Sequence, residues 1–135
     1  MAKTYYRWCG HAEEVFANYR RNKREIRAYL ASLSYSRTGN DGGSRGSRVS
    51  DPTARAAVTA LSDVRYQELQ RQTAAVKRVL KALPQRKADL MRRVYIEHRC
   101  TLQGAAAYFG VSYATARRWK QQACLALAYE LGWIG

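Results

Sequence analysis

The sequence predicts an all-α protein. Apolar residues recur every three or four positions in several stretches, which is the spacing of one helix face. Both prolines, Pro52 and Pro84, stand where a helix would begin, and proline suits the first turn because its missing N–H has no helical partner there. Residues 101–131 predict two helices joined by a tight turn. We therefore expect a helical N-terminal segment, a long helix and a C-terminal helix-turn-helix.

Three residues define the predicted turn. Thr101 can cap a first helix over residues 102–109, because its hydroxyl can accept a hydrogen bond from a free amide of the first turn. Gly110 follows that helix, and glycine enters the left-handed conformation at a helix end without steric cost. Ser112 can cap a second helix that runs from Tyr113 towards Glu130.

The second helix has two unlike faces. Small and apolar residues at helical spacing form the expected inward stripe: Ala116, Trp119, Ala123, Leu127 and Leu131. Polar and basic residues form the expected outward face, of the kind that contacts bases in the major groove: Tyr113, Thr115, Arg117, Arg118, Lys120, Gln121 and Gln122. The alternative is an ordinary helical hairpin with a solvated basic face.

The chain divides into three predicted parts. Residues 1–33 form a helical N-terminal segment, whose basic cluster would contact phosphate, an acidic partner or solvent. Residues 34–50 are rich in glycine and serine and predict a flexible linker, and their arginines also suit an arm in the DNA minor groove. Residues 51–135 form a helical DNA-binding domain with the helix-turn-helix at 101–131. Within it, a long helix is expected from Pro52 to about Ala82, followed by a helix from about Pro84 to His98.

The charge of the chain favours a polyanionic partner. It has 24 Lys and Arg against 10 Asp and Glu, a formal net charge of +14. Nucleic acid is the first partner that such a balance suggests, and an anionic membrane surface is the second. No run of about 18 apolar residues is present and no signal-peptide pattern opens the sequence. We therefore expect a cytoplasmic protein that does not enter the membrane.

The sequence offers no catalytic constellation. Carboxylates are scattered singly, and no glycine-rich phosphate loop follows a strand pattern. One metal site can be drawn from Cys9, His11, His98 and Cys100, but the spacing within each pair is tighter than zinc sites use. Three widely separated cysteines also make no disulfide framework, which fits a reducing compartment. We expect neither an enzyme nor a cofactor or metal.

Two resemblances bear on function. The block LPQRKADLMRRVYIEHRCTLQGAAAYFGVSYATARRWKQQACLALAYEL resembles the C-terminal promoter-binding region of sigma factors. The order of a tyrosine-containing basic helix, a Gly/Ser linker, the phrase SDPTARAA, a long helix ending in LP and a helix-turn-helix is similar to the RinA family of phage transcriptional regulators, relatives of the ArpU type.

These resemblances imply a sequence-specific transcription regulator of double-stranded DNA. The RinA family activates late genes of temperate phages, so host RNA polymerase is the implied protein partner, and a homo-oligomer is compatible. Base contacts are implied for Tyr113, Thr115, Arg117 and Arg118, with Lys120, Gln121 and Gln122 next. Lys87, Arg92 and Arg93 are implied phosphate contacts.

Two other phage functions remain open at this stage. A terminase small subunit is also small, helical and DNA-binding, but its DNA-binding region is N-terminal. A Q-type antitermination factor rides on RNA polymerase and can also carry a sigma-like DNA-binding domain. Subunit number separates the first from an activator, and transcription through a terminator separates the second.

Overall fold

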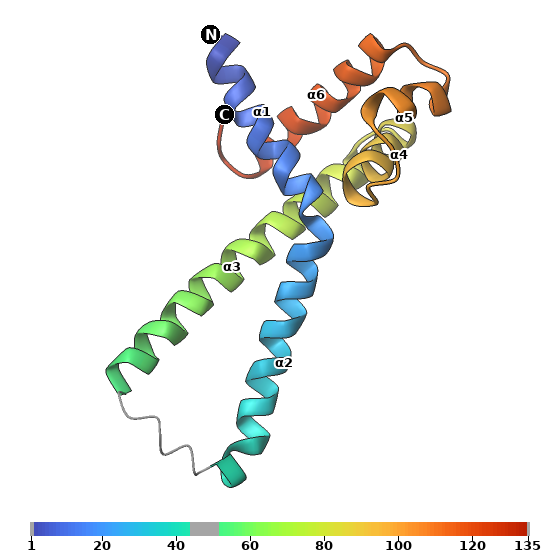
Figure 1. Ribbon diagram of the computed structural model, residues 1–135. Helices are drawn as coiled ribbons and strands as arrows, with labels where there is room; N and C mark the ends of the chain where they lie inside the picture. The colour runs from blue at the N-terminus through green and yellow to red at the C-terminus, as the bar shows by residue number, and fades with distance from the viewer. Residues whose placement is uncertain (1, 44–51, 135) are drawn as a thin grey trace. The chain divides into compact units, whose positions relative to one another are not determined.

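All regular structure that the chain shows is helical. The computed structural model describes residues 2–43 and 52–134, with side chains described for 8–33 and 61–134. Those residues contain no strand, so the predicted all-α class is confirmed. The elements in chain order (Figure 1) are α1 (Ala2–Ala17), α2 (Tyr19–Gly43), α3 (Pro52–Ala82), α4 (Gln85–Met91), η2 (Arg92–Ile96), α5 (Leu102–Phe109) and α6 (Tyr113–Glu130).

The chain forms two compact units that differ from the predicted division. The first unit combines Met1–Arg20 with Arg71–Gly135, and the second is Arg21–Gln70. The first unit is therefore assembled from both ends of the sequence. The prediction that residues 51–135 form a domain without the N-terminal helix needs correction, because α1 contributes to the same core as the helix-turn-helix.

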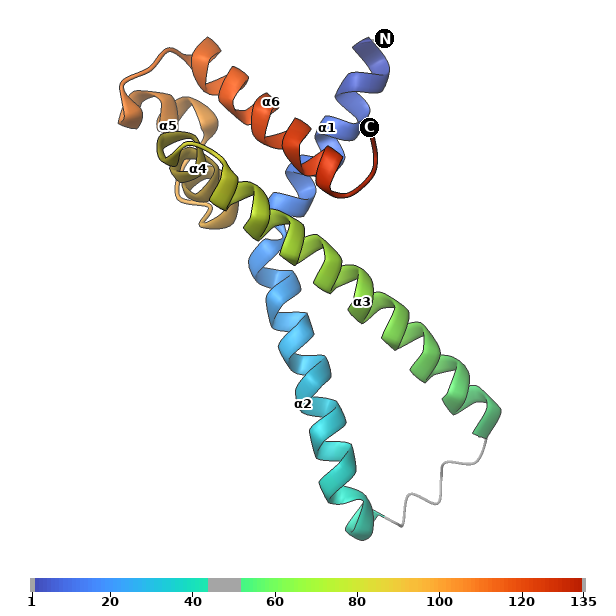
Figure 2. The same ribbon diagram turned by 180° about the vertical axis from the view of Figure 1, so that it is seen from behind.

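The core of the first unit is continuous through α1, α3, α4, η2, α5 and α6. One face of α1 is buried, with Phe16 and Ala12 wholly inaccessible to solvent. Figure 2 shows α1 lying against α6, a contact that also includes η2. The other helices add buried side chains at helical spacing. The largest that are fully buried are Val76 of α3, Leu90 and Met91 of α4, and Cys124 and Leu127 of α6.

The N-terminal segment is two helices rather than one. α1 ends at Ala17, and Asn18 forms a turn before α2 begins at Tyr19. Asparagine has a low helix propensity because its side chain competes for backbone hydrogen bonds. The apolar period runs almost unchanged across Asn18, so periodicity alone did not show the break.

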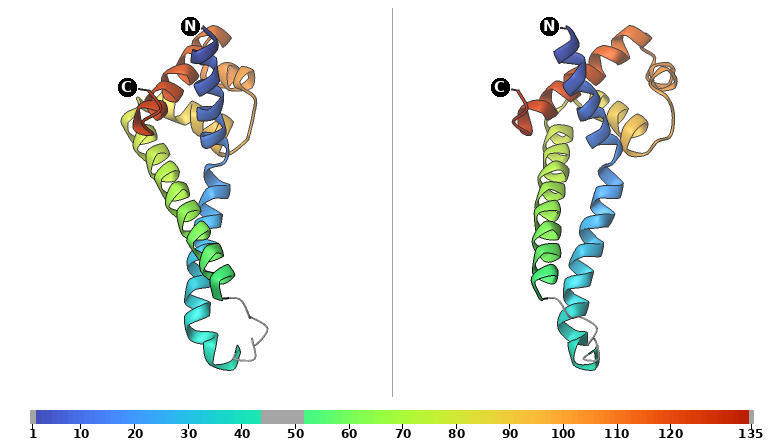
Figure 3. Two further views of the ribbon diagram at one scale, coloured as in Figure 1. Left: turned by 90° about the vertical axis from the view of Figure 1, so that its left-hand side faces the viewer. Right: turned by 60° about the vertical axis from the view of Figure 1, so that its left-hand side comes forward.

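The second unit is a pair of helices, parts of α2 and α3. Figure 3 traces α2 in blue to cyan and α3 in green, and Figure 1 shows the two helices diverging along their length. The Glu25 carboxylate accepts three hydrogen bonds from the Arg65 guanidinium, at 2.9, 3.1 and 3.2 Å, and the Tyr29 and Tyr66 rings stack with centroids 4.7 Å apart. These two contacts join α3 to the second helix of the N-terminal segment.

Part of the predicted linker is helical. α2 continues through Gly43, so it includes residues 34–43, whereas residues 44–50 lie outside the described part of the chain. The composition of this stretch does not explain the helix, because Gly39, Asn40, Asp41, Gly42 and Gly43 all have low helix propensity. The predicted linker arginines Arg45 and Arg48 also fall outside the described residues.

The predicted helix from Pro84 to His98 changes character along its length. α4 begins after Pro84, whose φ of −55° suits a helix start, and becomes the π-helical η2 at Arg92. The wider turn appears in the hydrogen bond from Glu97 N to Arg92 O, 2.7 Å. His98 then leaves the helix with φ at 53°, an uncommon value for a residue other than glycine.

Candidate nucleic-acid interface

The helix-turn-helix forms with the capping predicted from its sequence. Thr101 Oγ1 accepts from Gly104 N at 3.0 Å, and Ser112 Oγ accepts from Thr115 N at 3.1 Å. Gly110 lies in the left-handed region with φ at 69°, where a side chain would be strained. Each helix of the motif therefore starts at a side-chain cap, and the connection between them is as short as the sequence suggested.

The inward stripe of α6 is as expected except at Trp119. Ala116, Ala123 and Leu127 are fully buried and Leu131 is 4% exposed, which places one side of α6 in the core. Trp119 packs at the edge of the core and is only half-buried. The Arg86 guanidinium lies 5.5 Å from the centroid of its ring.

The first turns of α6 present a basic and aromatic surface to solvent. Tyr113, Arg117 and Arg118 are all exposed, and the Arg117 guanidinium lies 5.9 Å from the Tyr113 ring centroid. Thr115 is half-buried, and its hydroxyl oxygen accepts hydrogen bonds from Ser112 Oγ and from Arg118 Nη2 at 3.0 and 3.2 Å. Thr115 therefore orients Arg118 over the capped start of the helix.

Lys120 is the residue that differs most from the sequence-based expectation. Only 17% of its side chain is exposed, and its Nζ lies 3.2 Å from Glu13 Oε2 on α1. It connects α6 to α1 and does not belong to the outward face. Its spacing contained the signal, because Lys120 lies one helical turn after buried Ala116 and one turn before buried Cys124.

Glu13 is the centre of a polar cluster that joins α1, η2 and α6. Besides Lys120, it accepts hydrogen bonds from Tyr95 Oη at 3.1 Å and from Cys9 Sγ at 3.9 Å. Burial, with the Glu13 charge and hydrogen bond, raises the pKa of the Tyr95 hydroxyl above its ordinary value of 10.0. The cluster gives the contact between α1 and α6 a directional component that apolar packing lacks.

The two buried thiols of Cys9 and Cys124 interact directly. A hydrogen bond from Cys124, aided by the charge of Lys120, lowers the pKa of the Cys9 thiol to about 7. The same hydrogen bond, together with burial, raises the pKa of the Cys124 thiol. The pair thus releases its first proton easily and its second with difficulty, as expected for coupled groups.

The remaining predicted residues surround the motif on α4, η2 and the middle of α6. Lys87 Nζ donates to Gln122 Oε1 at 2.6 Å, which links α4 to the exposed side of α6, and Gln121 is half-buried. Arg92 pairs with Asp89 at 2.9 Å, with about two fifths of each side chain exposed. The Arg93 guanidinium lies 3.7 Å from the ring centroid of Tyr108 on α5.

Two arginines were missed by the sequence analysis. Arg99 joins Arg92, Arg93 and Tyr108 around a small polar pocket of about 280 Å³ beside α5. Arg86 donates to the carbonyl oxygen of Phe109, the last residue of α5. A cation at a helix C-terminus satisfies a carbonyl that has no helical partner, so Arg86 stabilises the turn.

The described residues also bear on the possible metal site and on a possible membrane span. Among the described residues, no three His, Cys, Asp or Glu side chains converge closely enough to hold a metal ion. His98 Nε2 instead lies 3.0 Å from Ala17 O, and the His11 ring contacts Trp133 edge-on. Over the same described ranges, no helix has the length and apolar character needed to cross a membrane.

One comparison with known proteins yields a match. The family described as "Protein of unknown function (DUF1804)" matches residues 81–125, which run from the end of α3 through α4, η2 and α5 into α6. No curated protein and no solved structure matches the chain. The matched segment thus includes α5, the turn and most of α6.

Proposed function

We propose that this protein binds double-stranded DNA sequence-specifically, with α6 as the recognition helix. The observation that carries the proposal is the exposed surface of Tyr113, Arg117 and Arg118 on the first turns of α6, whose other side is buried at Ala116, Ala123 and Leu127. In helix-turn-helix proteins, residues at this end of the second helix contact base edges in the major groove. Such docking requires a helix with one face packed in the core and a basic face exposed to solvent.

Each residue of the interface has a proposed role. Arg117 and Arg118 suit guanine, whose O6 and N7 accept two hydrogen bonds from one guanidinium. Thr115 positions Arg118, and Gln122 is exposed and linked to Lys87. Lys87, Arg92 and Arg93 suit phosphate contacts, because α4 and η2 flank the motif. Lys120 is left out of the proposed interface, since its ammonium already pairs with Glu13.

We further propose that DNA binding regulates transcription, in the manner of a phage late-gene activator in the cytoplasm of a bacterial host. Support comes from the likeness of residues 83–131 to the promoter-binding region of sigma factors and from the RinA-like order of segments. On this proposal RNA polymerase is the protein partner. The net charge of +14 favours approach to DNA irrespective of sequence.

Selection from a random duplex pool tests the DNA-binding proposal. The native protein is expected to enrich one sequence family, and Arg117→Ala is expected to weaken binding to it by about 1–3 kcal/mol. Log affinity for the selected duplex should fall with log salt by about 0.9 per neutralised phosphate. Failure to enrich any sequence, or a slope near zero, contradicts the proposal.

The selected site then tests the regulatory role. Placed upstream of a promoter in a purified system, it should increase initiation by bacterial RNA polymerase when the protein is added. Increased transcription through a terminator, without increased initiation, would favour the antitermination factor. A ring of many subunits in a mass measurement would favour the terminase small subunit.

A further inference from the structure

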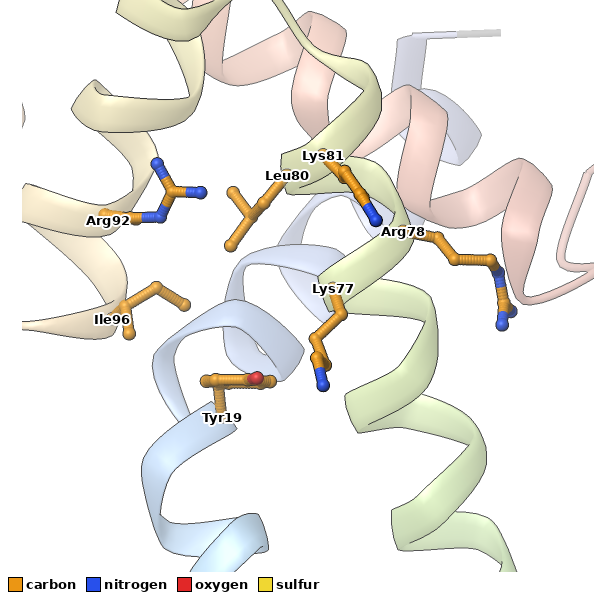
Figure 4. A pocket seen from close by; sticks show the side chains of 7 residues that line it. All are labelled: Tyr19, Lys77, Arg78, Leu80, Lys81, Arg92 and Ile96. Atoms are coloured by element: carbon orange, nitrogen blue, oxygen red, sulfur yellow. The ribbon is translucent and has the colours of Figure 1, made fainter.

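A second surface of the first unit combines apolar and cationic side chains away from the recognition helix. Figure 4 shows a pocket of about 610 Å³ between the start of α2, the last turns of α3 and η2. No residue of α5 or α6 lines it. The pocket is therefore formed without the recognition helix.

The floor of the pocket is apolar. Leu80 and Ile96 form it with exposed fractions of 8% and 6%, and the Tyr19 ring lies beside them (Figure 4). A volume of this size lies within the range of pockets that hold small ligands or a bulky side chain. The floor can exclude water from an apolar group, and such burial contributes about 25 cal/mol per Å² of apolar surface.

The rim of the pocket is entirely cationic. Arg78 and Arg92 stand on it but are already paired, with Glu130 at 2.7 Å and with Asp89 at 2.9 Å. Lys77 and Lys81 are exposed, and among the described residues neither ammonium has an ion-pair or hydrogen-bond partner. No carboxylate lines the pocket, so nothing in its wall repels a negatively charged occupant.

We propose that this pocket binds an acidic segment of a partner protein, in which one bulky apolar side chain is flanked by carboxylates. Lys77 and Lys81 lie one helical turn apart on α3, so their ammonium groups project on the same side. Two carboxylates one turn apart on a partner helix match that spacing, and the apolar side chain between them reaches Leu80 and Ile96. Helix-in-groove recognition combines these two elements.

The apolar floor is what favours a peptide over a phosphate backbone. A phosphodiester chain would satisfy the lysines but would leave Leu80 and Ile96 without an apolar contact. The pocket has no lining residue on α5 or α6, and Arg92 is its one residue that is also a proposed phosphate contact. The inference does not depend on the proposed DNA binding.

Fluorescence anisotropy with designed peptides and the full-length protein tests the inference. The probe is a fluorescein-labelled helical peptide with one phenylalanine between glutamates spaced one turn apart. The native protein should bind it saturably. Replacing the peptide's phenylalanine by serine, or its glutamates by glutamine, should each weaken binding by about tenfold, because each change removes one of the two contacts.

Matched charge reversals on the protein locate the site. Lys77→Glu combined with Lys81→Glu should weaken peptide binding by about tenfold or more. Arg24→Glu combined with Arg27→Glu makes the same change in net charge at exposed positions of the second unit, and should change binding by less than about twofold. Circular dichroism of both variants checks that the fold is retained.

Three outcomes would overturn the inference. The native protein could fail to bind the peptide saturably, or the two double variants could weaken binding equally, which would reduce the effect to net charge. Alternatively, Lys77→Glu with Lys81→Glu could leave peptide binding unchanged and selectively weaken binding to a random-sequence duplex. That result would assign the two lysines to phosphate contacts.

Discussion

The two compact units of this protein are both helical, but they differ in how much of each is buried in a core. The first has a core that runs through α1, the end of α3, α4, α5 and α6. In the second, the described positions 21–33 and 61–70 include only two buried residues, Asn22 and Leu69. Four large apolar side chains there are exposed by 44–70%: Leu30, Leu33, Leu61 and Val64.

The difference shows that helical character alone says little about which helices share a core. α1 is separated from α6 by almost the whole sequence, yet it belongs to the unit that contains the recognition helix. α2 follows α1 after a single turn residue and lies mainly in the other unit. Stability of the proposed DNA-binding surface should therefore depend on α1 much more than on the α2–α3 pair.

The largest expected effect is on the core of the first unit. Phe16→Ala removes a fully buried ring from α1 and should lower the free energy of unfolding by about 3–5 kcal/mol through lost burial and the cavity that remains. Leu61→Ala truncates a side chain that is 70% exposed in the second unit and should change it by less than about 0.5 kcal/mol.

Urea denaturation of both variants, followed by circular dichroism, measures this contrast. A similar loss in the two variants would mean that Leu61 is covered in solution, and a small loss at Phe16 would mean that α1 is dispensable. A fragment of residues 51–135 provides a second test, because without α1 it should fail to give a cooperative transition.

Trp119 offers an intermediate case at the edge of the same core. Trp119→Ala should cost about 2 kcal/mol, less than a fully buried aromatic, because the ring is half-buried and also loses its contact with Arg86. Thermal melting by circular dichroism measures the effect, because that signal does not depend on the tryptophan that the substitution removes. A loss as large as that at Phe16 would place Trp119 inside the core.

Substitution of one glutamate in each unit compares the strength of their polar contacts. Glu13→Gln removes the charge that pairs with Lys120 and weakens the hydrogen bond to Tyr95, so it should cost about 1–2 kcal/mol. Glu25→Gln acts on an ion pair whose Arg65 side chain is 61% exposed, and should cost less than about 1 kcal/mol. Equal losses in urea denaturation would remove the distinction between the two clusters.

The smallest expected effect is a pH dependence that belongs to the first unit. The folded state raises the pKa of Tyr95, so folded protein holds the phenolic proton at a pH where unfolded protein has released it. This contribution to stability is complete below about pH 10 and is lost as the pH rises further. Melting temperature should therefore fall less steeply above about pH 10 in Tyr95→Phe than in the native protein.

The comparison of Tyr95→Phe with the native protein is not affected by the other group whose pKa is raised. Cys124, whose pKa is also raised, is present in both proteins and changes both melting curves in the same direction. Parallel decline of the two proteins with pH would show that Tyr95 does not contribute.

Local features of the fold were predictable from the sequence, whereas contacts between distant segments were not. Thr101, Gly110 and Ser112 act through neighbouring backbone, so their types and spacing sufficed to predict the motif. Helical periodicity identified a buried face on the N-terminal segment, but it did not show which helices that face packs against. The role of Lys120 depends on Glu13, more than a hundred residues away, and only its position on the inward side gave an indication.

In the candidate interface, the exposed positions of α6 were predicted from the sequence, whereas contacts between helices were not. Tyr113, Arg117 and Arg118 are exposed as expected, since outward positions follow from the buried stripe of the same helix. The part played by Arg86 was not predicted, because it requires the end of α5 to lie beside α4. The π-helical turn of η2 was not predicted either, because no local pattern in RRVYI indicates it.

Matched arginine pairs in the two units test the central claim most directly. The measurement is the Kd of native protein, of Arg117→Ala with Arg118→Ala, and of Arg24→Ala with Arg27→Ala, for the selected duplex and for a scrambled one. Both double variants lose the same charge at exposed positions. The α6 variant should weaken binding to the selected duplex by about 100-fold and to the scrambled duplex far less, while the α2 variant affects both duplexes slightly and equally. Equal losses for the two variants, or equal losses on the two duplexes, would contradict sequence recognition by α6.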